Sequence, residues 1–213
     1  MKQLMGKVVI NKKWKRTKTG PKYANGFVGG YPGLTLTARR ISEFIPHCNI
    51  FVEPFAGLGR VSKKVKADKK VLNDMSDYAY EHNKKKFKDW TITKEDFIAC
   101  VLRWDSEATF FFFDPPWRFM QYDPNHTLAF CDRTVKQYYQ DILKMVPNLK
   151  GNWMIAGEVH EKESGRLLQN SGYPNHVIRT NYKMLGGRIQ VRLCSNKPFV
   201  NYHQTTIDRN CST

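Results

Sequence analysis

From Thr35 onwards, short apolar runs of strand length alternate with stretches of helical character. The pattern predicts strands at 49–55, 69–74, 109–114 and 152–158, and helices at 35–45, 59–67, 76–90, 94–104, 134–146 and 161–170. Two further strands, 175–182 and 188–195, are joined through turn glycines into a hairpin. This order predicts an α/β fold: a Rossmann-like, doubly wound, mostly parallel sheet with a C-terminal antiparallel hairpin that places a reversed strand at the edge.

The charge of the chain predicts the class of its partner. The formal net charge is +16 and the pI is near 9.7, which favours a polyanion, with nucleic acid the leading candidate. One folded domain is expected at 29–200, between a basic N-terminal arm at 1–28 and a C-terminal tail at 201–213. No apolar stretch approaches the ~20 residues of a spanning helix and no signal-peptide pattern is present, so we expect no membrane partner and an intracellular, cytoplasmic location.

The cysteines argue against a metal or a disulfide framework. They are odd in number, scattered and never form a C-x-x-C pair: Cys48, Cys100, Cys131, Cys194 and Cys211. Reduced thiols that serve mostly for packing are expected, and no metal site is predicted.

Two glycines, Gly57 and Gly59, follow the expected strand at 49–55. Glycine lets the backbone approach a ligand closely, and a following helix would offer amide donors. Asp74 ends the next strand, 15 positions after Gly59, near the offset of ~20 residues at which an acid meets ribose hydroxyls in nucleotide folds. Together they indicate a nucleotide-like cofactor; the alternative is a tight turn without a ligand.

The stretch "FFFFDPPW" suggests a pocket for a flat ring. Asp114 emerges where the strand ends, at the carboxyl edge at which open α/β sheets bind ligands. Pro115 and Pro116 remove two amide donors, which leaves carbonyls free to accept. An acid, a free carbonyl and the Trp117 face suit an exocyclic amine, as in adenine or cytosine. The alternative is a proline-rich turn with a packing tryptophan.

Thr93 and Asp96 have the spacing of a capping box, which predicts a helix that begins at Thr93 with Asp96 in its first turn. In that interpretation the Asp96 side chain has less freedom to bind a ligand.

Four segments, "FVEPFAGLG", "VLNDMS", "EDF" and "FFFFDPPW", in that order, resemble the Dam-type S-adenosylmethionine-dependent adenine-N6 DNA methyltransferases. The later "RLCSNKPF" is similar to their closing strand, so the resemblance runs from about Gly29 to Phe199. It implies S-adenosylmethionine as the cofactor and nucleic acid as the substrate.

The resemblance also implies roles for individual residues. The methionine part of the cofactor would lie among Gly30, Tyr31, Glu53, Pro54, Phe55, Ala56, Gly57 and Gly59, with Asp74 on the ribose and Asp96 and Phe97 on the adenine. The target base would be held by Asp114, which also borders the cofactor, and by Pro115, Pro116 and Trp117. These roles for Asp96 take precedence over the capping interpretation, because four motifs in order are more specific than one.

The sequence departs from the family at three points. Tyr31 stands where the N-terminal motif usually carries a lysine, and Trp117 replaces the commoner tyrosine. Only 55 positions separate Gly59 from Asp114, whereas Dam-type enzymes place a target-recognition domain between the matching motifs.

We therefore expect an enzyme that methylates adenine N6 in DNA. The alternatives are an RNA adenine-N6 methyltransferase and a non-catalytic nucleic-acid-binding protein on a methyltransferase fold. A protein partner that supplies target specificity is compatible with the missing domain. The basic side chains expected to contact phosphates are Lys12, Lys13, Lys15, Arg16, Lys18, Lys22 and Arg118.

Overall fold

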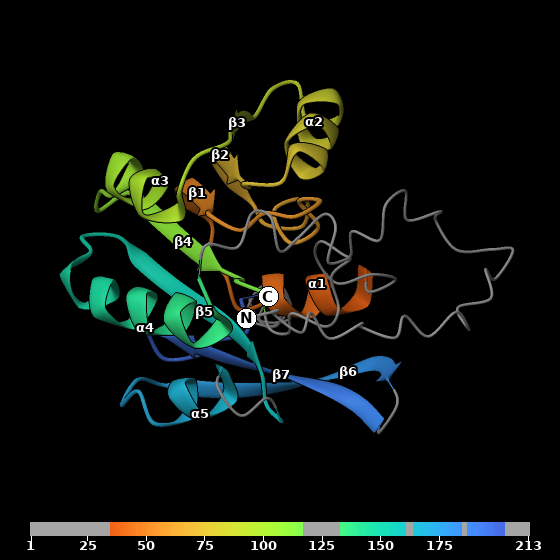
Figure 1. Ribbon diagram of the computed structural model, residues 1–213, viewed down its shortest axis with the longest axis vertical. Coiled ribbons are helices and arrows are strands. Elements are labelled where there is room, and N and C mark those ends of the chain that lie inside the picture. The colour runs from red at the N-terminus through yellow and green to blue at the C-terminus, as the bar shows by residue number, and fades with distance from the viewer. Residues whose placement is uncertain (1–34, 117–132, 161–163, 185–186, 203–213) are drawn as a thin grey trace, which may run out of the picture.

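The computed structural model describes residues 35–116, 133–160, 164–184 and 187–202 (Figure 1). A seven-stranded sheet has the order β3-β2-β1-β4-β5-β7-β6. The strands are β1 (Cys48–Glu53), β2 (Ala67–Asn73), β3 (Thr91–Thr93), β4 (Thr109–Phe113), β5 (Asn152–Glu158), β6 (Asn175–Met184) and β7 (Gly187–Ser195). The helices are α1 (Thr35–Ser42), α2 (Asp77–Lys86), α3 (Phe97–Trp104), α4 (Val135–Met145) and α5 (Ser164–Gln169), with a short 3-10 turn at Val146–Asn148.

The strand directions confirm the predicted fold class. The strands β1 to β5 pair in parallel, and β7 runs antiparallel to both β5 and β6. The reversed strand is therefore not at the edge, as expected from the sequence, but lies between β5 and β6. Burial explains this order: Val191, Leu193 and Cys194 of β7 are fully buried, whereas Ile178 is the buried hydrophobic residue of β6.

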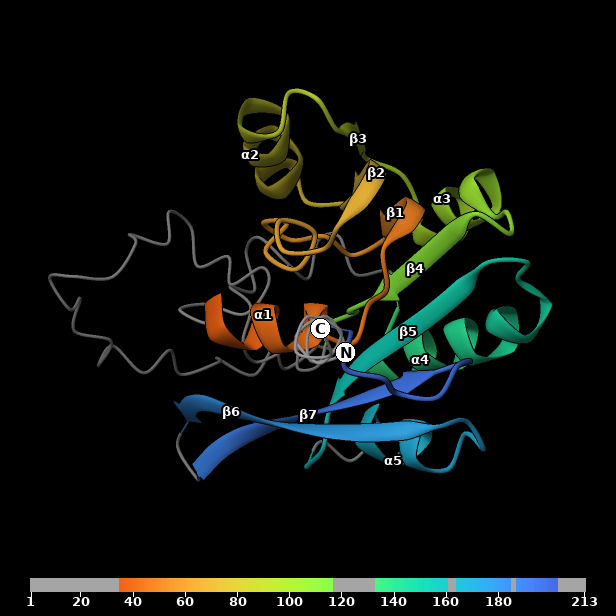
Figure 2. The same cartoon turned by 180° about the vertical axis from the view of Figure 1, so that it is seen from behind.

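The strand β4 lies at the centre of the core. All of its residues are buried, and the side chains of Phe111, Phe112 and Phe113 have no exposed surface. A strand that is apolar on both faces needs cover on both, as in other parallel sheets. Helix α1 packs against β6, and α5 packs against β5, β7 and α4 (Figures 1 and 2). This burial fixes the end of β4, and with it the position of Asp114.

The helix predicted at 59–67 is wrong, because this segment is a series of turns. Some helical bonds form, such as Lys63 N to Gly59 O at 3.1 Å. The buried Ser62, however, donates its backbone N–H, at 3.3 Å, and its hydroxyl to the Glu53 carboxylate. Its N–H therefore does not join a regular ladder of main-chain bonds.

Two other helices are shorter than predicted: α1 ends at Ser42 and α2 at Lys86. None of the helices in the described part of the chain is long and apolar enough to cross a membrane.

Candidate cofactor and target-base site

The structure brings the main predicted residues to the carboxyl edge of the parallel strands. Glu53 is the last residue of β1, Asp74 follows β2 directly, and Asp114 follows β4 directly. Since β1 pairs with both β2 and β4, these strand ends are neighbours. This is the edge at which open α/β sheets bind ligands.

Asp74 holds the glycine turn that follows β1. Its Oδ2 accepts from Gly57 N at 2.7 Å, and its Oδ1 accepts from Ser76 N at 2.9 Å. The pKa of Asp74 is raised by burial, against the lowering effect of these two hydrogen bonds. Each carboxylate oxygen has a second acceptor position, so the group can hold the turn and still accept from a further hydroxyl.

The backbone of this turn requires glycine. Gly57 and Gly59 have φ of 50° and 63°, in the left-handed region that side chains disfavour. A Cβ at Gly59 would stand 2.7 Å from Leu72 Cδ2 and 2.9 Å from Phe87 Cε2, which is too close. The turn can therefore pass closely over the end of β2.

Glu53 is buried at the end of β1, with 2% of its surface exposed. Burial raises the pKa of Glu53 to about 8, the hydrogen bonds from Ser62 lower it, and the negative charges of Asp114 and Asp74 raise it further. Three carboxyl groups thus lie within electrostatic reach of one another. Such a site favours a positively charged ligand, which would relieve the repulsion.

The stability of the protein should report this burial. The folded state keeps the Glu53 proton up to about pH 8, whereas the unfolded chain loses it near 4.5, so the free energy of unfolding falls as pH rises through this window, by up to about 1.4 kcal/mol per pH unit. Glu53→Gln, which resembles the protonated acid, should flatten the slope. Denaturant unfolding at several pH values measures it, with the exposed Glu107→Gln as the control. Equal slopes in wild type and Glu53→Gln would contradict the assignment.

Asn73, which the sequence analysis missed, ties three loops of this edge together. Its Nδ2 donates to Pro54 O at 3.1 Å and to Glu95 O at 2.8 Å. Its Oδ1 accepts from Thr93 Oγ1 at 2.9 Å and from Glu95 N at 3.0 Å. An asparagine that ends a buried strand beside Asp74 is the signal that could have identified it.

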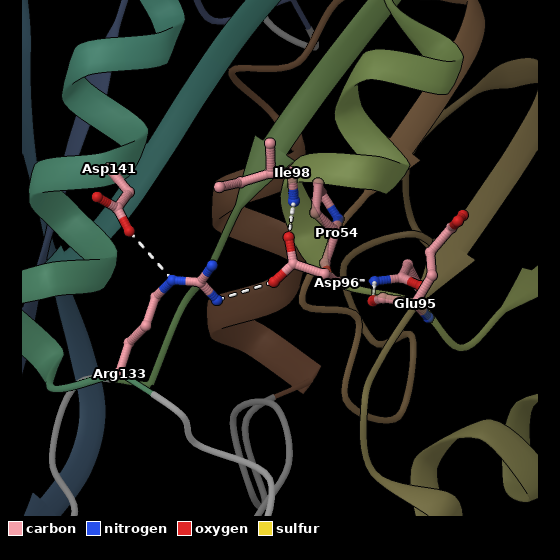
Figure 3. A network of polar contacts seen from close by, with 7 residues as sticks. Pro54, Glu95, Asp96, Ile98, Arg133 and Asp141 are labelled. Carbon is pink, nitrogen blue, oxygen red and sulfur yellow. Dashed lines mark hydrogen bonds and ion pairs between the residues drawn. The ribbon is translucent and has the colours of Figure 1, made fainter.

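The capping box predicted for Thr93 and Asp96 is wrong. Thr93 belongs to β3, and Asp96 is itself the N-cap of α3, where its Oδ1 accepts from Ile98 N at 2.9 Å. The hydrogen bonds from Thr93 and Glu95 to Asn73 extend the chain up to Glu95 and delay the helix. Figure 3 shows Asp96 at the start of the helix, with its carboxylate turned towards Arg133.

Arg133 was also missed, and it joins two acids from different helices (Figure 3). Its Nη1 donates to Asp96 Oδ2 at 2.8 Å, and its Nε donates to Asp141 Oδ2 at 3.1 Å. Only 20% of the Arg133 side chain is exposed. No local pattern could have identified it, because Asp96 is 37 positions away.

An aromatic cluster lies beneath this ion pair. The Arg133 guanidinium carbon lies 5.1 Å from the centre of the Phe97 ring and 5.9 Å from that of Tyr138. Phe55 contacts both rings, at centroid distances of 4.9 and 5.5 Å. The structure therefore places the predicted Phe55, Asp96 and Phe97 together, with an apolar surface beside a fixed carboxylate.

The remaining predicted positions divide into two groups. Pro54, Ala56 and Pro115 are buried next to the strand ends, and Pro116 is partly buried. The others lie outside the described residues: Gly30, Tyr31, Trp117, Arg118, Lys12, Lys13, Lys15, Arg16, Lys18 and Lys22.

Residues 35–98 match the model of the family described as D12 class N6 adenine-specific DNA methyltransferase. This match confirms the resemblance inferred from the motifs over that part of the chain. No curated protein matches the sequence.

Solved structures show the same fold at low sequence identity. A Streptococcus mutans protein in complex with SAH is 13% identical, with a TM-score of 0.50 over 78% of this chain and 99% of that one. Magnesium protoporphyrin IX methyltransferase from Synechocystis PCC 6803, with bound SAM, is 9% identical, with a TM-score of 0.51 over 78% of this chain and 80% of that one. With the family match, the fold supports an S-adenosylmethionine-dependent methyltransferase.

Proposed function

We propose that this protein transfers the methyl group of S-adenosylmethionine to adenine N6 in DNA. The observation that supports it is the order of the acids along one sheet edge: Glu53, Asp74 and Asp114 end three neighbouring strands. The family match covers the first two of them. Asp114 and the carbonyl beside it are then available for the substrate.

The acids suit the charge of the cofactor. S-adenosylmethionine supplies its methyl group from a positively charged sulfonium centre. Glu53, Asp74 and Asp114 lie close enough for the last two to raise the pKa of the first, so a positive ligand is favoured there. Asp74 would accept from the ribose, since its oxygens have further acceptor positions beside the bonds from Gly57 and Ser76.

Asp114 and Pro115 would orient the target amine. The adenine N6 lone pair is delocalised into the ring, so the amine is a poor nucleophile. Acceptors for both of its hydrogens, the Asp114 carboxylate and the Pro115 carbonyl, localise the lone pair towards the methyl group as the transition state forms. Because N6 is paired inside a duplex, the base must leave the stack, which costs a few kcal/mol. Trp117 would offset part of this cost by stacking.

Asp96 would accept from the adenine amine of the cofactor, with Phe97 beside the ring. Arg133 keeps the Asp96 carboxylate ionised and fixed through a charge-assisted hydrogen bond of 2.8 Å. Arg133 is thus a positioning residue of the adenine subsite.

Arg133→Gln is expected to weaken the binding of S-adenosylhomocysteine about 3- to 10-fold, because Asp96 loses its charged partner at a partly exposed position. It should also reduce the preference for S-adenosylhomocysteine over S-inosylhomocysteine, which lacks the amine. Calorimetry measures both. Asp141→Asn, which leaves the Asp96 contact in place, is the control, and a variant with wild-type affinity and preference would contradict this role.

A second candidate is methylation of adenine in RNA. Every helix and strand between Gly59 and Asp114 belongs to the sheet or packs along it, so this interval contains no target-recognition domain. Target choice would then come from another part of the chain or from a protein partner. This arrangement suits an RNA substrate as well as a DNA substrate. A third candidate is a non-catalytic nucleic-acid-binding protein.

The test is methyl transfer by the full chain from cofactor labelled in its methyl group. Duplex DNA, single-stranded DNA, RNA and polymers without adenine are compared as acceptors. The proposal predicts label in DNA that contains adenine and none in the adenine-free polymers. Stronger labelling of RNA would favour the second candidate. Cofactor binding without any transfer to nucleic acid would favour the third.

A further inference from the structure

The glycine turn after β1 packs directly against α2. Asn83 Nδ2 on α2 donates to Gly57 O at 2.9 Å. Phe87, directly after the helix, packs so closely that a Cβ at Gly59 would lie 2.9 Å from its ring. Figures 1 and 2 both show α2 beside the segment that follows β1. The side chains that follow Gly59 therefore share a surface with the C-terminal half of α2.

Four basic side chains gather on this shared surface: Arg60 and Lys63 from the turn segment, and His82 and Lys86 from α2. The pKa of Lys86 is lowered by partial burial and then by the charges of Lys63 and Arg60. The pKa of His82 is lowered by partial burial and then by Lys86 and Arg60. Each of these effects requires like charges at short range, so the four groups form one cluster.

Acidic groups do not neutralise the exposed lysines of this cluster. Within the described residues, neither Lys63 nor Lys86 forms an ion pair, and Lys86 Nζ lies 5.2 Å from the Phe87 ring centre. The two acids nearest in sequence are paired elsewhere: Asp68 with His47 and Asp77 with Lys94.

Exposed lysines continue the surface on both elements. Residues 60–70 contain six cations and one acid, and residues 81–90 contain four cations and two acids. We define the α2 basic face as the cluster together with its exposed neighbours Lys64, Lys66, Lys69, Lys84, Lys85 and Lys88. Like charges gathered without counter-charges destabilise the free protein, and a bound anion relieves the repulsion. A face this wide fits a row of phosphates better than one small anion.

We propose that the α2 basic face binds the phosphate backbone of the nucleic acid that enters the site. The inference rests on the proposed function for the identity of that nucleic acid. The face begins at Arg60, next to the Gly57–Gly59 turn, and so borders the carboxyl edge where Asp114 would hold the target base. Phosphate contacts position the substrate without reading its sequence.

The test compares two double variants of the full chain. Lys63→Gln/Lys86→Gln removes two charges from the face. Lys144→Gln/Lys150→Gln removes two exposed charges near the C-terminal end of α4 and after it. The affinity for a labelled DNA duplex is measured at several salt concentrations. The face variant should lose up to ~1.8 in the slope of log affinity against log salt, at ~0.9 per phosphate contact. The control should keep the wild-type slope.

Three outcomes would overturn the inference: equal slopes in wild type and face variant, an equal loss in the control, or a loss confined to one sequence. S-adenosylhomocysteine binding shows that the variants are folded. If the double variant does not bind it, Lys86→Gln alone is tested, with an expected loss of up to ~0.9. A wild-type protein that methylates nucleic acid with an unaltered slope in the face variant would refute this inference alone, whereas failure to methylate any nucleic acid would refute the proposed function alone.

Discussion

Asp114→Asn is expected to lower the methyl-transfer rate about 10²- to 10³-fold, by analogy with the removal of one preorganised group that stabilises a transition state. The amide would present N–H donors where the target amine needs an acceptor, and it removes a negative charge at the end of β4. Single-turnover transfer to saturating nucleic acid measures the chemical step. We expect the affinity for S-adenosylhomocysteine to stay within about threefold of wild type.

Asp141→Asn serves as the matched control for this prediction. It makes the same chemical change in a half-buried acid of α4, whose partner is the Nε of Arg133. Its transfer rate at saturating cofactor should remain close to that of wild type. An Asp114→Asn protein that transfers methyl groups at a near-wild-type rate would show that Asp114 does not hold the target amine.

The second large effect is expected from Asp74→Ala. Loss of a charge-assisted hydrogen bond to the ribose should weaken cofactor binding by about 1.5 to 3 kcal/mol, or roughly 10- to 150-fold. Asp74 also holds the amides of Gly57 and Ser76. The variant therefore frees part of the turn as well, and affinity alone cannot separate the two effects.

A cofactor analogue without the ribose hydroxyls separates them. Wild type should bind S-adenosylhomocysteine more tightly than the analogue, and Asp74→Ala should bind the two almost equally. Calorimetry on both proteins with both ligands gives the four affinities. A folded Asp74→Ala protein that keeps the wild-type preference would place the ribose elsewhere.

The sequence alone predicted the sheet well, because its signal is local. Each apolar run that must be buried, such as Phe110 to Phe113, became a strand, and the turn glycines gave the hairpin of β6 and β7. The acids at the ends of β1, β2 and β4 were predicted for the same reason, since a residue that follows a parallel strand lies at its carboxyl edge.

Features that depend on distant contacts were not predicted. Residues 59–67 have the periodicity of a helix, but the Glu53 carboxylate takes the amide of Ser62. The start of α3 moved to Asp96 because Asn73, from another strand, holds the residues before it. The role of Arg133 depends on a partner in a different helix. Periodicity and capping rules describe neighbours in sequence, so they cannot register such contacts.

The identity of the methylated base tests the central claim most directly. The full chain is incubated with DNA or RNA and with cofactor that carries a deuterated methyl group, and the nucleic acid is then digested to nucleosides for mass spectrometry. Our account predicts labelled N6-methyladenine nucleoside from wild type and almost none from Asp114→Asn. Label on another base, on a different adenine atom, or equally in both proteins would contradict it.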